Sequence, residues 1–224
     1  MTVLVVAAHP DDEALGCGGT IARHAAAGDE VVVAFIADGV TSRDPAADHA
    51  PEIARRRDAA RAAAAILGVA DVHFGDLPDN GLDTVGLLTI AQAVEALIRD
   101  ASPEIVYTHH AHDLNVDHRL VHEAVLTAAR PQPGSGITTV LAFETTSSTE
   151  WRSPQSVPAF SPDWFVDITD TLALKLQALD AYAEEMRPWP HPRSREAVTH
   201  LAHWRGSTVG RVAAEAFALA RHIS

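Results

Sequence analysis

Two short segments of the sequence concentrate residue types that hold metal ions and move protons. Residues 9–13 read HPDDE and follow a six-residue apolar run. Residues 109–118 hold four histidines and two aspartates in ten positions. Two imidazoles and a carboxylate are a common ligand set for a catalytic zinc ion that keeps an open position for water. The two segments therefore predict a hydrolytic metal centre, provided that the fold brings them together.

In the first segment, His9 and Asp12 lie three positions apart where a turn opens a helix, so both side chains can point at one ion. Asp11 must leave the backbone in another direction, where it can face the same cavity as a general base. The simpler interpretation is that an aspartate at this place only caps the helix. Three acids in one loop favour the metal, because buried negative charge is costly unless a cation offsets it.

In the second segment, His118 is the expected third ligand, which would complete a set of two imidazoles and one carboxylate. His118 and His122 are an alternative pair one helical turn apart. The zincin motif, however, places a glutamate between its two histidines, and this sequence has none there. For the other histidines of this loop, solvated positions and contact with the reacting groups both stay open. The same ligand set also suits Fe(II), Co or Mn, so the metal itself is not determined.

A glycine-rich run at residues 16–19 (GCGG) suggests a nucleotide site, but the dinucleotide fingerprint needs a further glycine where Ile21 stands. We expect these small residues to let a helix approach the sheet closely. Cys17 has no adjacent base that would activate it as a nucleophile. As the only cysteine, it also excludes an internal disulfide and a thiolate zinc cluster.

The elements that must position these residues alternate between short β-rich runs and helical patterns, which predicts βαβ units and a parallel sheet. We expect strands over residues 3–8, 31–36, 72–74, 105–108 and 140–143, with an edge strand over 165–168. We expect helices over residues 13–27, 51–67, 84–100 and 117–130, and two more over 171–185 and 196–222 that are separated by the proline-rich residues 187–192. Both candidate segments then follow carboxyl ends of strands, where open sheets bind ligands.

The composition sets the class of protein and of partner. A chain of 224 residues, 47% of them apolar, can bury a sizeable core as one α/β domain. A net charge of −13 argues against nucleic acid and anionic membranes as partners. No stretch approaches the roughly 18 apolar residues of a membrane span. We expect a cytoplasmic protein with a small-molecule substrate, and we leave open whether it forms a homo-oligomer.

On these residues the sequence resembles the LmbE-like deacetylases, the family related to N-acetylglucosaminyl-phosphatidylinositol de-N-acetylase (PIG-L). The AHPDDE run at residues 8–13 is similar to the family's most specific motif, and the likeness in strand pattern covers about the first 145 residues. The resemblance implies zinc ligation by His9, Asp12 and His118. It also implies Asp11 as general base and Asp117 in support of the site.

The resemblance further implies a fold and a reaction. The fold would be a Rossmann-like parallel sheet with helices on both faces over about residues 1–145, followed by a C-terminal helical extension over about 146–224. The two parts would form a single LmbE-like domain spanning residues 1–224. The reaction would be zinc-dependent hydrolysis of an amide, removing an acetyl group from an N-acetyl amino sugar or its conjugate. A metal in such a site lowers the pKa of its bound water towards roughly 7, so that Asp11 can take the proton.

The chain departs from the commoner family pattern, a His-Pro-Asp-His run with a further catalytic histidine. Asn115 stands at that histidine's place, in an Asn-x-Asp-His variant whose members carry segments similar to residues 147–151, 190–194 and 214–217. The group that steadies the oxyanion or protonates the amine is then His112, His191 or the Asn115 amide. We rank His112 first, because it shares a loop with the third ligand.

Four further residues are expected to contact the substrate, two of them arginines that suit a phosphate or carboxylate. These residues are Asp113, His191, Arg193 and Arg205. Two other classes of function remain as alternatives. A nucleotide-binding oxidoreductase could use the same fold, and a non-catalytic zinc-binding or carbohydrate-binding module would close the metal in four ligands. The incomplete glycine fingerprint and the surplus of metal-ligand residues favour the hydrolase.

Overall fold

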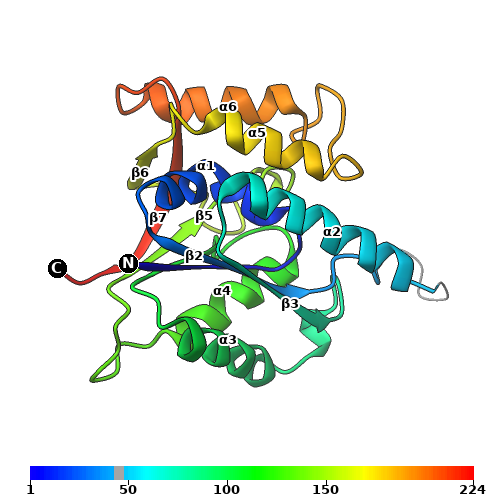
Figure 1. Ribbon diagram of the computed structural model, residues 1–224, viewed down its shortest axis with the longest axis vertical. Coiled ribbons are helices and arrows are strands. Elements are labelled where there is room, and N and C mark those ends of the chain that lie inside the picture. The colour runs from blue at the N-terminus through cyan, green and yellow to red at the C-terminus, as the bar shows by residue number, and fades with distance from the viewer. Residues whose placement is uncertain (43–47) are drawn as a thin grey trace.

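The computed structural model describes residues 1–42 and 48–224, and its strands form one sheet in the order β3-β2-β1-β4-β5-β7-β6 (Figure 1). The strands are β1 (Thr2–Ala7), β2 (Glu30–Ala37), β3 (Asp71–Leu77), β4 (Ile105–His109), β5 (Thr139–Phe143), β6 (Trp164–Asp167) and β7 (Ala214–His222). The first five run parallel, whereas β7 is antiparallel to both β5 and β6. The strand order reverses at β1, between β2 and β4, and such a point is where open sheets bind ligands.

Helices cover both faces of the sheet, which confirms the predicted α/β class. They are α1 (Asp12–Ala26), α2 (Ala50–Leu67), α3 (Leu87–Ala101), α4 (Val116–Ala128), α5 (Leu172–Ala181) and α6 (Arg195–Ser207). Figure 1 shows α1 and α2 on one face and α3 and α4 on the other, with α5 and α6 outside α1 and α2. Within the described part of the chain, no helix is long and apolar enough to cross a membrane.

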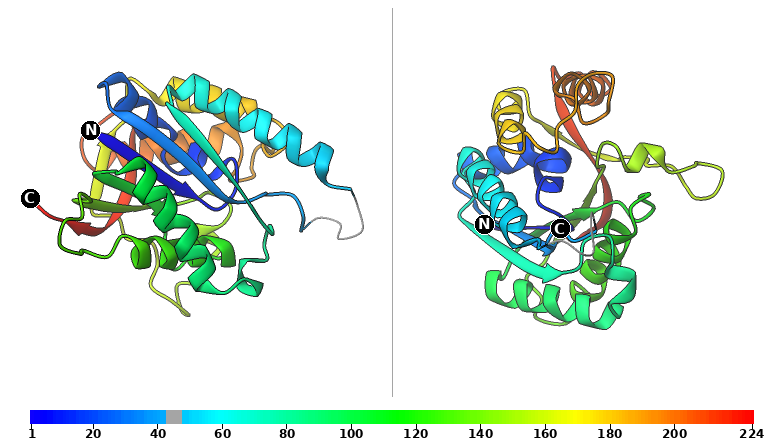
Figure 2. Two further views of the ribbon diagram at one scale, coloured as in Figure 1. Left: turned by 60° about the horizontal axis from the view of Figure 1, so that its bottom comes forward. Right: turned by 90° about the vertical axis from the view of Figure 1, so that its right-hand side faces the viewer.

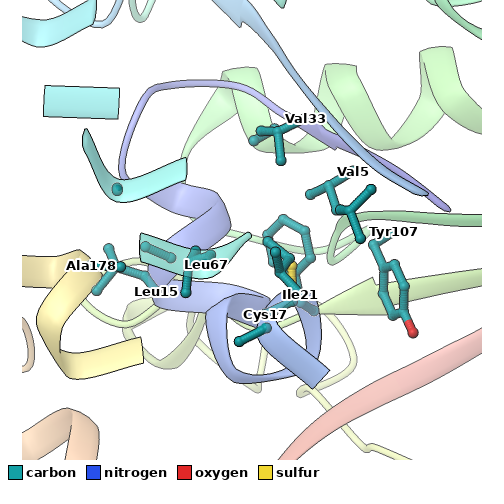
Figure 3. Packing of buried hydrophobic residues seen from close by; sticks show 14 of the residues in the cluster. Val5, Leu15, Cys17, Ile21, Val33, Leu67, Tyr107 and Ala178 are labelled. Carbon is teal, nitrogen blue, oxygen red and sulfur yellow. The ribbon is translucent and has the colours of Figure 1, made fainter. Parts of the chain in front are cut away.

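Strand residues alternate between two apolar clusters, one on each face of the sheet. In β1, Val3 and Val5 pack in the cluster under α1, α2 and α5, whereas Leu4 and Val6 pack in the cluster under α3 and α4. Burial on both faces explains why β1 is a continuous apolar run rather than an alternating one. Figure 3 shows the first cluster, in which the Cys17 side chain lies among apolar neighbours.

Helix α1 is broken at Cys17, which has φ −144° and ψ 23°, and a buried ion pair from two other elements bridges the break. On one side, Nζ of Lys175 in α5 donates to the carbonyl of Leu15 at 2.8 Å. On the other side, Glu215 of β7 accepts the backbone N–H groups of Gly19 and of the next residue, at 2.9 and 2.7 Å. The two charged groups lie 2.5 Å apart. Backbone groups left unpaired by the break therefore find buried partners.

The prediction that residues 196–222 are helical was right for the start of this range and wrong for its end. Helix α6 ends at Ser207, and Ala214–His222 forms strand β7. The alanine-rich run has a high intrinsic helix propensity. Pairing with β5 on one side and β6 on the other overrides this propensity and turns the buried Glu215 towards Lys175. The predicted edge strand is confirmed as β6, but β6 and β7 make the sheet mixed rather than wholly parallel.

Candidate metal centre and active site

Three predicted ligands converge at the carboxyl ends of β1 and β4. Oδ2 of Asp12, the first residue of α1, lies 3.2 Å from Nδ1 of His9 and 3.3 Å from Nε2 of His118. One ligand atom from each residue lies within 4.8 Å of the other two, a grouping that can hold one ion. His9 is 8% exposed, and the other two are almost fully buried. The two segments singled out in the sequence therefore meet.

The charges of this cluster are out of balance. Burial opposes protonation of His9, but its contacts with Asp117 and Asp12 outweigh burial and raise its pKa to about 10. Burial also opposes protonation of His118, yet Asp12 and Asp113 raise the pKa of this imidazole to about 9. Oδ1 of Asp12 is buried without a hydrogen-bond partner in the described residues. Surplus carboxylates, imidazoles that attract a positive charge and an unpaired ligand oxygen together fit a divalent cation.

Each imidazole of the cluster has a buried carboxylate at its second nitrogen. Nε2 of His9 lies 3.0 Å from Oδ2 of Asp117 and 3.1 Å from Oδ1 of Asp79. Nδ1 of His118 lies 3.2 Å from Oδ1 of Asp113. Carboxylates in such positions orient the rings of ligating histidines and make them more basic. Asp117 therefore stands where the resemblance implies a supporting residue.

Asp113, which we predicted to contact the substrate, lies behind His118. The residue is fully buried, and its carboxylate accepts hydrogen bonds from the Thr149 hydroxyl at 2.6 Å, from the Ser148 hydroxyl, and from the N–H of Asn115 at 2.9 Å. These bonds, together with His118, occupy the carboxylate on all sides. Its Oδ1 lies 3.2 Å from Nδ1 of His118, on the side of the ring away from Asp12.

Asp11, the predicted general base, has a strained backbone with φ 122° and ψ −27°, a region that residues with a side chain rarely adopt. Its N–H donates to Oε2 of Glu13 at 3.0 Å, and the Tyr182 hydroxyl holds Oε1 of the same glutamate at 2.7 Å. Nη1 of Arg193 donates to Oδ2 of Asp11 at 2.7 Å. Burial raises the pKa of Asp11 to about 6, against the lowering effect of Arg193. Its side chain makes no capping bond to α1, so the simpler interpretation fails.

Asn115, one of the three groups predicted to contact the oxyanion, makes two side-chain hydrogen bonds within the chain. Its Oδ1 accepts the N–H of Asp117 at 2.8 Å and thereby caps α4. Its Nδ2 donates to Oδ1 of Asn80 at 2.9 Å. Both ends of the amide are engaged within the chain, which makes Asn115 a helix cap that links the loops after β3 and β4.

The remaining predicted residues lie around the centre at different depths. Nδ1 of His191 accepts the N–H of Arg193 at 3.0 Å, so the proline-rich loop shapes the position of that arginine. His112 is half-buried, with its ring edge-on to that of His110 at 5.7 Å. Arg205 pairs with both carboxylate oxygens of Glu144, each at 2.7 Å, so its charge is balanced within the chain.

Two residues of the site were not assigned a role from the sequence. Asp79 follows β3, and His109 ends β4 with Nε2 accepting the N–H of Ala8 at 2.8 Å and lying 3.5 Å from Asp12. His122, the alternative ligand, contacts the His109 carbonyl through Nδ1 at 2.8 Å. The sequence did offer a signal for such residues, namely a polar residue just after a parallel strand. This signal would have indicated Asp79 as a site residue.

Comparison with known proteins gives consistent matches. The family description PIG-L, GlcNAc-PI de-N-acetylase, matches residues 4–129. The chain is 30% identical to 1D-myo-inositol 2-acetamido-2-deoxy-alpha-D-glucopyranoside deacetylase 1 of Saccharopolyspora erythraea, over 84% of this chain and 78% of that one. It is 27% identical to a probable N-acetyl-alpha-D-glucosaminyl L-malate deacetylase 2 of Bacillus cereus, over 82% and 83%. A solved structure of the 4-carboxy-2-hydroxymuconate hydratase of Pseudomonas putida has a TM-score of 0.79 and 27% identity, covering 100% of this chain and 97% of that one.

Proposed function

Because the chain belongs to the PIG-L family of de-N-acetylases, we propose that it is a zinc-dependent N-deacetylase acting on an N-acetylglucosamine conjugate. The observation that carries this proposal is the buried group of His9, Asp12 and His118, which lies directly beside Asp11 and has the further carboxylates of Asp79, Asp113 and Asp117 around it. These residue types suit metal-assisted hydrolysis, in which a carboxylate next to the metal moves the proton.

In this proposal His9, Asp12 and His118 would hold the ion, which when bound supplies a Lewis acid for the amide carbonyl and acidifies water. Asp11 accepts the proton of the water that attacks the acetyl carbon, and Arg193 orients the Asp11 carboxylate through their 2.7 Å contact. The C–N bond then breaks, the oxygen of water ends on acetate, and the amine takes a proton. The candidate proton donors are Asp11 itself and His112 in the loop after β4.

A second candidate function is the addition of water to a carbon–carbon double bond in a carboxylated substrate. The 27% identity to a hydratase over the whole chain favours it. The same residues would serve, because hydration also needs a base that activates water and a cationic group opposite the developing negative charge. The two candidates differ in their products, since only a deacetylase releases acetate.

An acetate-release assay separates the two candidates. N-acetylglucosaminyl inositol and N-acetylglucosaminyl malate are offered to the zinc-loaded protein, to protein treated with a chelator, and to treated protein supplied again with zinc, cobalt or manganese. We expect acetate from at least one conjugate, loss of acetate release with the chelator, and recovery with zinc. Absence of acetate from both, with loss of the double-bond absorbance of 4-carboxy-2-hydroxymuconate, would instead support the hydratase.

A further inference from the structure

One loop contacts both halves of the candidate site. The segment that joins β5 to β6 projects from the body of the molecule in the right-hand view of Figure 2, where it is yellow-green. We call residues 145–151, at the start of this segment, the β5 loop. Its residues Ser148 and Thr149 are buried, whereas Glu150 is exposed. The β5 loop therefore packs against the protein on one side and faces solvent on the other.

The first contact of the β5 loop is with the carboxylate beside the candidate ligand His118. The hydroxyl groups of Ser148 and Thr149 both donate to Asp113, the second of them to Oδ2 at 2.6 Å. Oγ1 of Thr149 also accepts the N–H of Thr145 at 2.8 Å, which leaves its own proton for Asp113. Because Asp113 in turn contacts Nδ1 of His118, the β5 loop fixes the carboxylate that orients this ring.

The second contact is with the arginine that holds the candidate base. Nε of Arg193 donates to Oγ of Ser147 at 2.8 Å, and Nη1 of the same arginine donates to Oδ2 of Asp11 at 2.7 Å. The guanidinium is planar and rigid, so a bond at Nε sets the direction in which Nη1 points. Ser147 therefore acts on the direction of the Asp11 carboxylate through Arg193.

The backbone of Ser147 indicates that its side chain is needed. Its φ of 66° lies in the left-handed region, which strains a residue with a side chain and which glycine adopts freely. Glu150 holds the turn, because its two carboxylate oxygens accept the N–H groups of Ser147 and Ser148 at 2.7 and 3.3 Å. A glycine would make the same turn with less strain but would offer no hydroxyl to Arg193.

We propose that the β5 loop is a shared support for the metal and the base, in which Ser148 and Thr149 position His118 and Ser147 positions Asp11. The inference rests on the proposed function, which gives His118 to the metal and proton transfer to Asp11. All three loop residues are positioning residues, since each acts through a second residue. His118 and Asp11 belong to different loops of the sheet, and a common support keeps them in one relative geometry, as metal-assisted proton transfer requires.

Ser147→Gly tests the contact with the base. The urea midpoint should stay close to that of the unaltered protein, because glycine adopts the left-handed conformation without strain. We expect kcat for acetate release to fall about tenfold with KM unchanged, since Arg193 no longer holds Asp11 in one direction. Zinc affinity, measured by competition with a chromogenic chelator, should not change. Ser153→Gly, at an exposed position of the same segment, is the control and should keep full kcat.

The double variant Ser148→Ala with Thr149→Val tests the contact with the metal ligand. Asp113 loses two donors, so the zinc dissociation constant should rise about tenfold, as it does when the outer partners of ligands are removed. With zinc at saturation, kcat should return to within about threefold of the unaltered value. Thr149→Val alone, which leaves the Ser148 donor, should show a smaller rise, and Thr149→Ser, which keeps the hydroxyl, should show none.

A measurement without turnover separates the support from the proposed function. The NMR signal of Nε–H of Arg193, assigned by its loss in Arg193→Lys, should exchange with water at least tenfold faster in Ser147→Gly. If this exchange rate is unchanged, or if both loop variants lose zinc affinity and kcat to the same extent, the shared support is overturned. If both zinc affinity and exchange respond as expected but no conjugate releases acetate, only the deacetylase is overturned.

Discussion

The two ends of the parallel sheet differ in how their polar groups are paired. At the carboxyl end, carboxylates crowd around two imidazoles and Oδ1 of Asp12 has no partner within the described residues. At the amino end lies a cavity of about 720 Å³, and four of its polar groups are linked to one another. Asp29 binds the N-terminal amine at 3.2 Å and His24 at 2.8 Å, and His24 contacts the Tyr107 hydroxyl at 3.0 Å.

The larger cavity is therefore not where the chemistry is indicated. The volume of a cavity shows only where side chains leave space. A buried charged group with an unpaired atom, by contrast, indicates that a ligand binds there. Helix α1 joins the two ends, with Asp12 at its start and His24 near its end. Substitutions at either end, or at the break between them, test whether the two ends are as different as their hydrogen bonds indicate.

The largest effect is expected from Asp11→Asn at the carboxyl end. The amide cannot accept the proton from water, so turnover should fall by about 10²- to 10⁴-fold, as general bases contribute in other enzymes. Zinc content, measured by atomic absorption, should stay at the level of the unaltered protein, because Asp11 is not in the ligand group. Asp29→Asn at the amino end is the matched control and should leave turnover unchanged. Full turnover in Asp11→Asn would remove its role as the base.

An intermediate effect is expected at the break in α1. Lys175→Met leaves Glu215 buried without its counter-charge, which should cost about 3–5 kcal/mol in the free energy of unfolding. The double variant Lys175→Met with Glu215→Leu should recover only part of that loss, since it removes the unpaired charge but leaves the N–H groups of Gly19 and Thr20 without their acceptor. Urea unfolding measures both. If the single variant were as stable as the unaltered protein, the pair would not support α1.

The smallest effect is expected from Tyr107→Phe at the amino end. The change removes a hydroxyl that contacts Nε2 of His24 at 3.0 Å and keeps the aromatic ring in the core. The free energy of unfolding should fall by about 1 kcal/mol, as is usual for one hydrogen bond. Acetate release at saturating substrate should not change. A loss of turnover comparable to that of Asp11→Asn would mean that the amino end is coupled to the reaction.

The parallel part of the fold was predictable because its signals are local. Short apolar runs alternate with helical patterns, and Gly68 ends α2 in the left-handed conformation that a glycine at this place predicts. Once the strands are parallel, the segments after β1 and β4 must emerge at the same end of the sheet. This geometry is why His9 and His118 could be expected to meet before any coordinates were known.

The contacts that were missed depend on residues distant in the sequence and outside regular elements. The role of Asp113 became visible only with Ser148 and Thr149, about 35 residues further along the chain. No periodicity connects such loops. The prediction for the residues of β7 failed for the opposite reason, because their local helix propensity is clear but misleading. Its alanines favour a helix in isolation, and the sheet supplies two neighbours that favour a strand.

The place of β7 between β5 and β6 also governs when the sheet can be completed during synthesis. Strand β6 leaves the ribosome before β7, but its ladder partner in the sheet is β7, with Trp164 opposite Phe217. Until residues 214–222 have been made, β5 therefore presents an open edge that other chains could pair with. Contacts so distant along the chain form slowly, which makes this stage the one most exposed to aggregation.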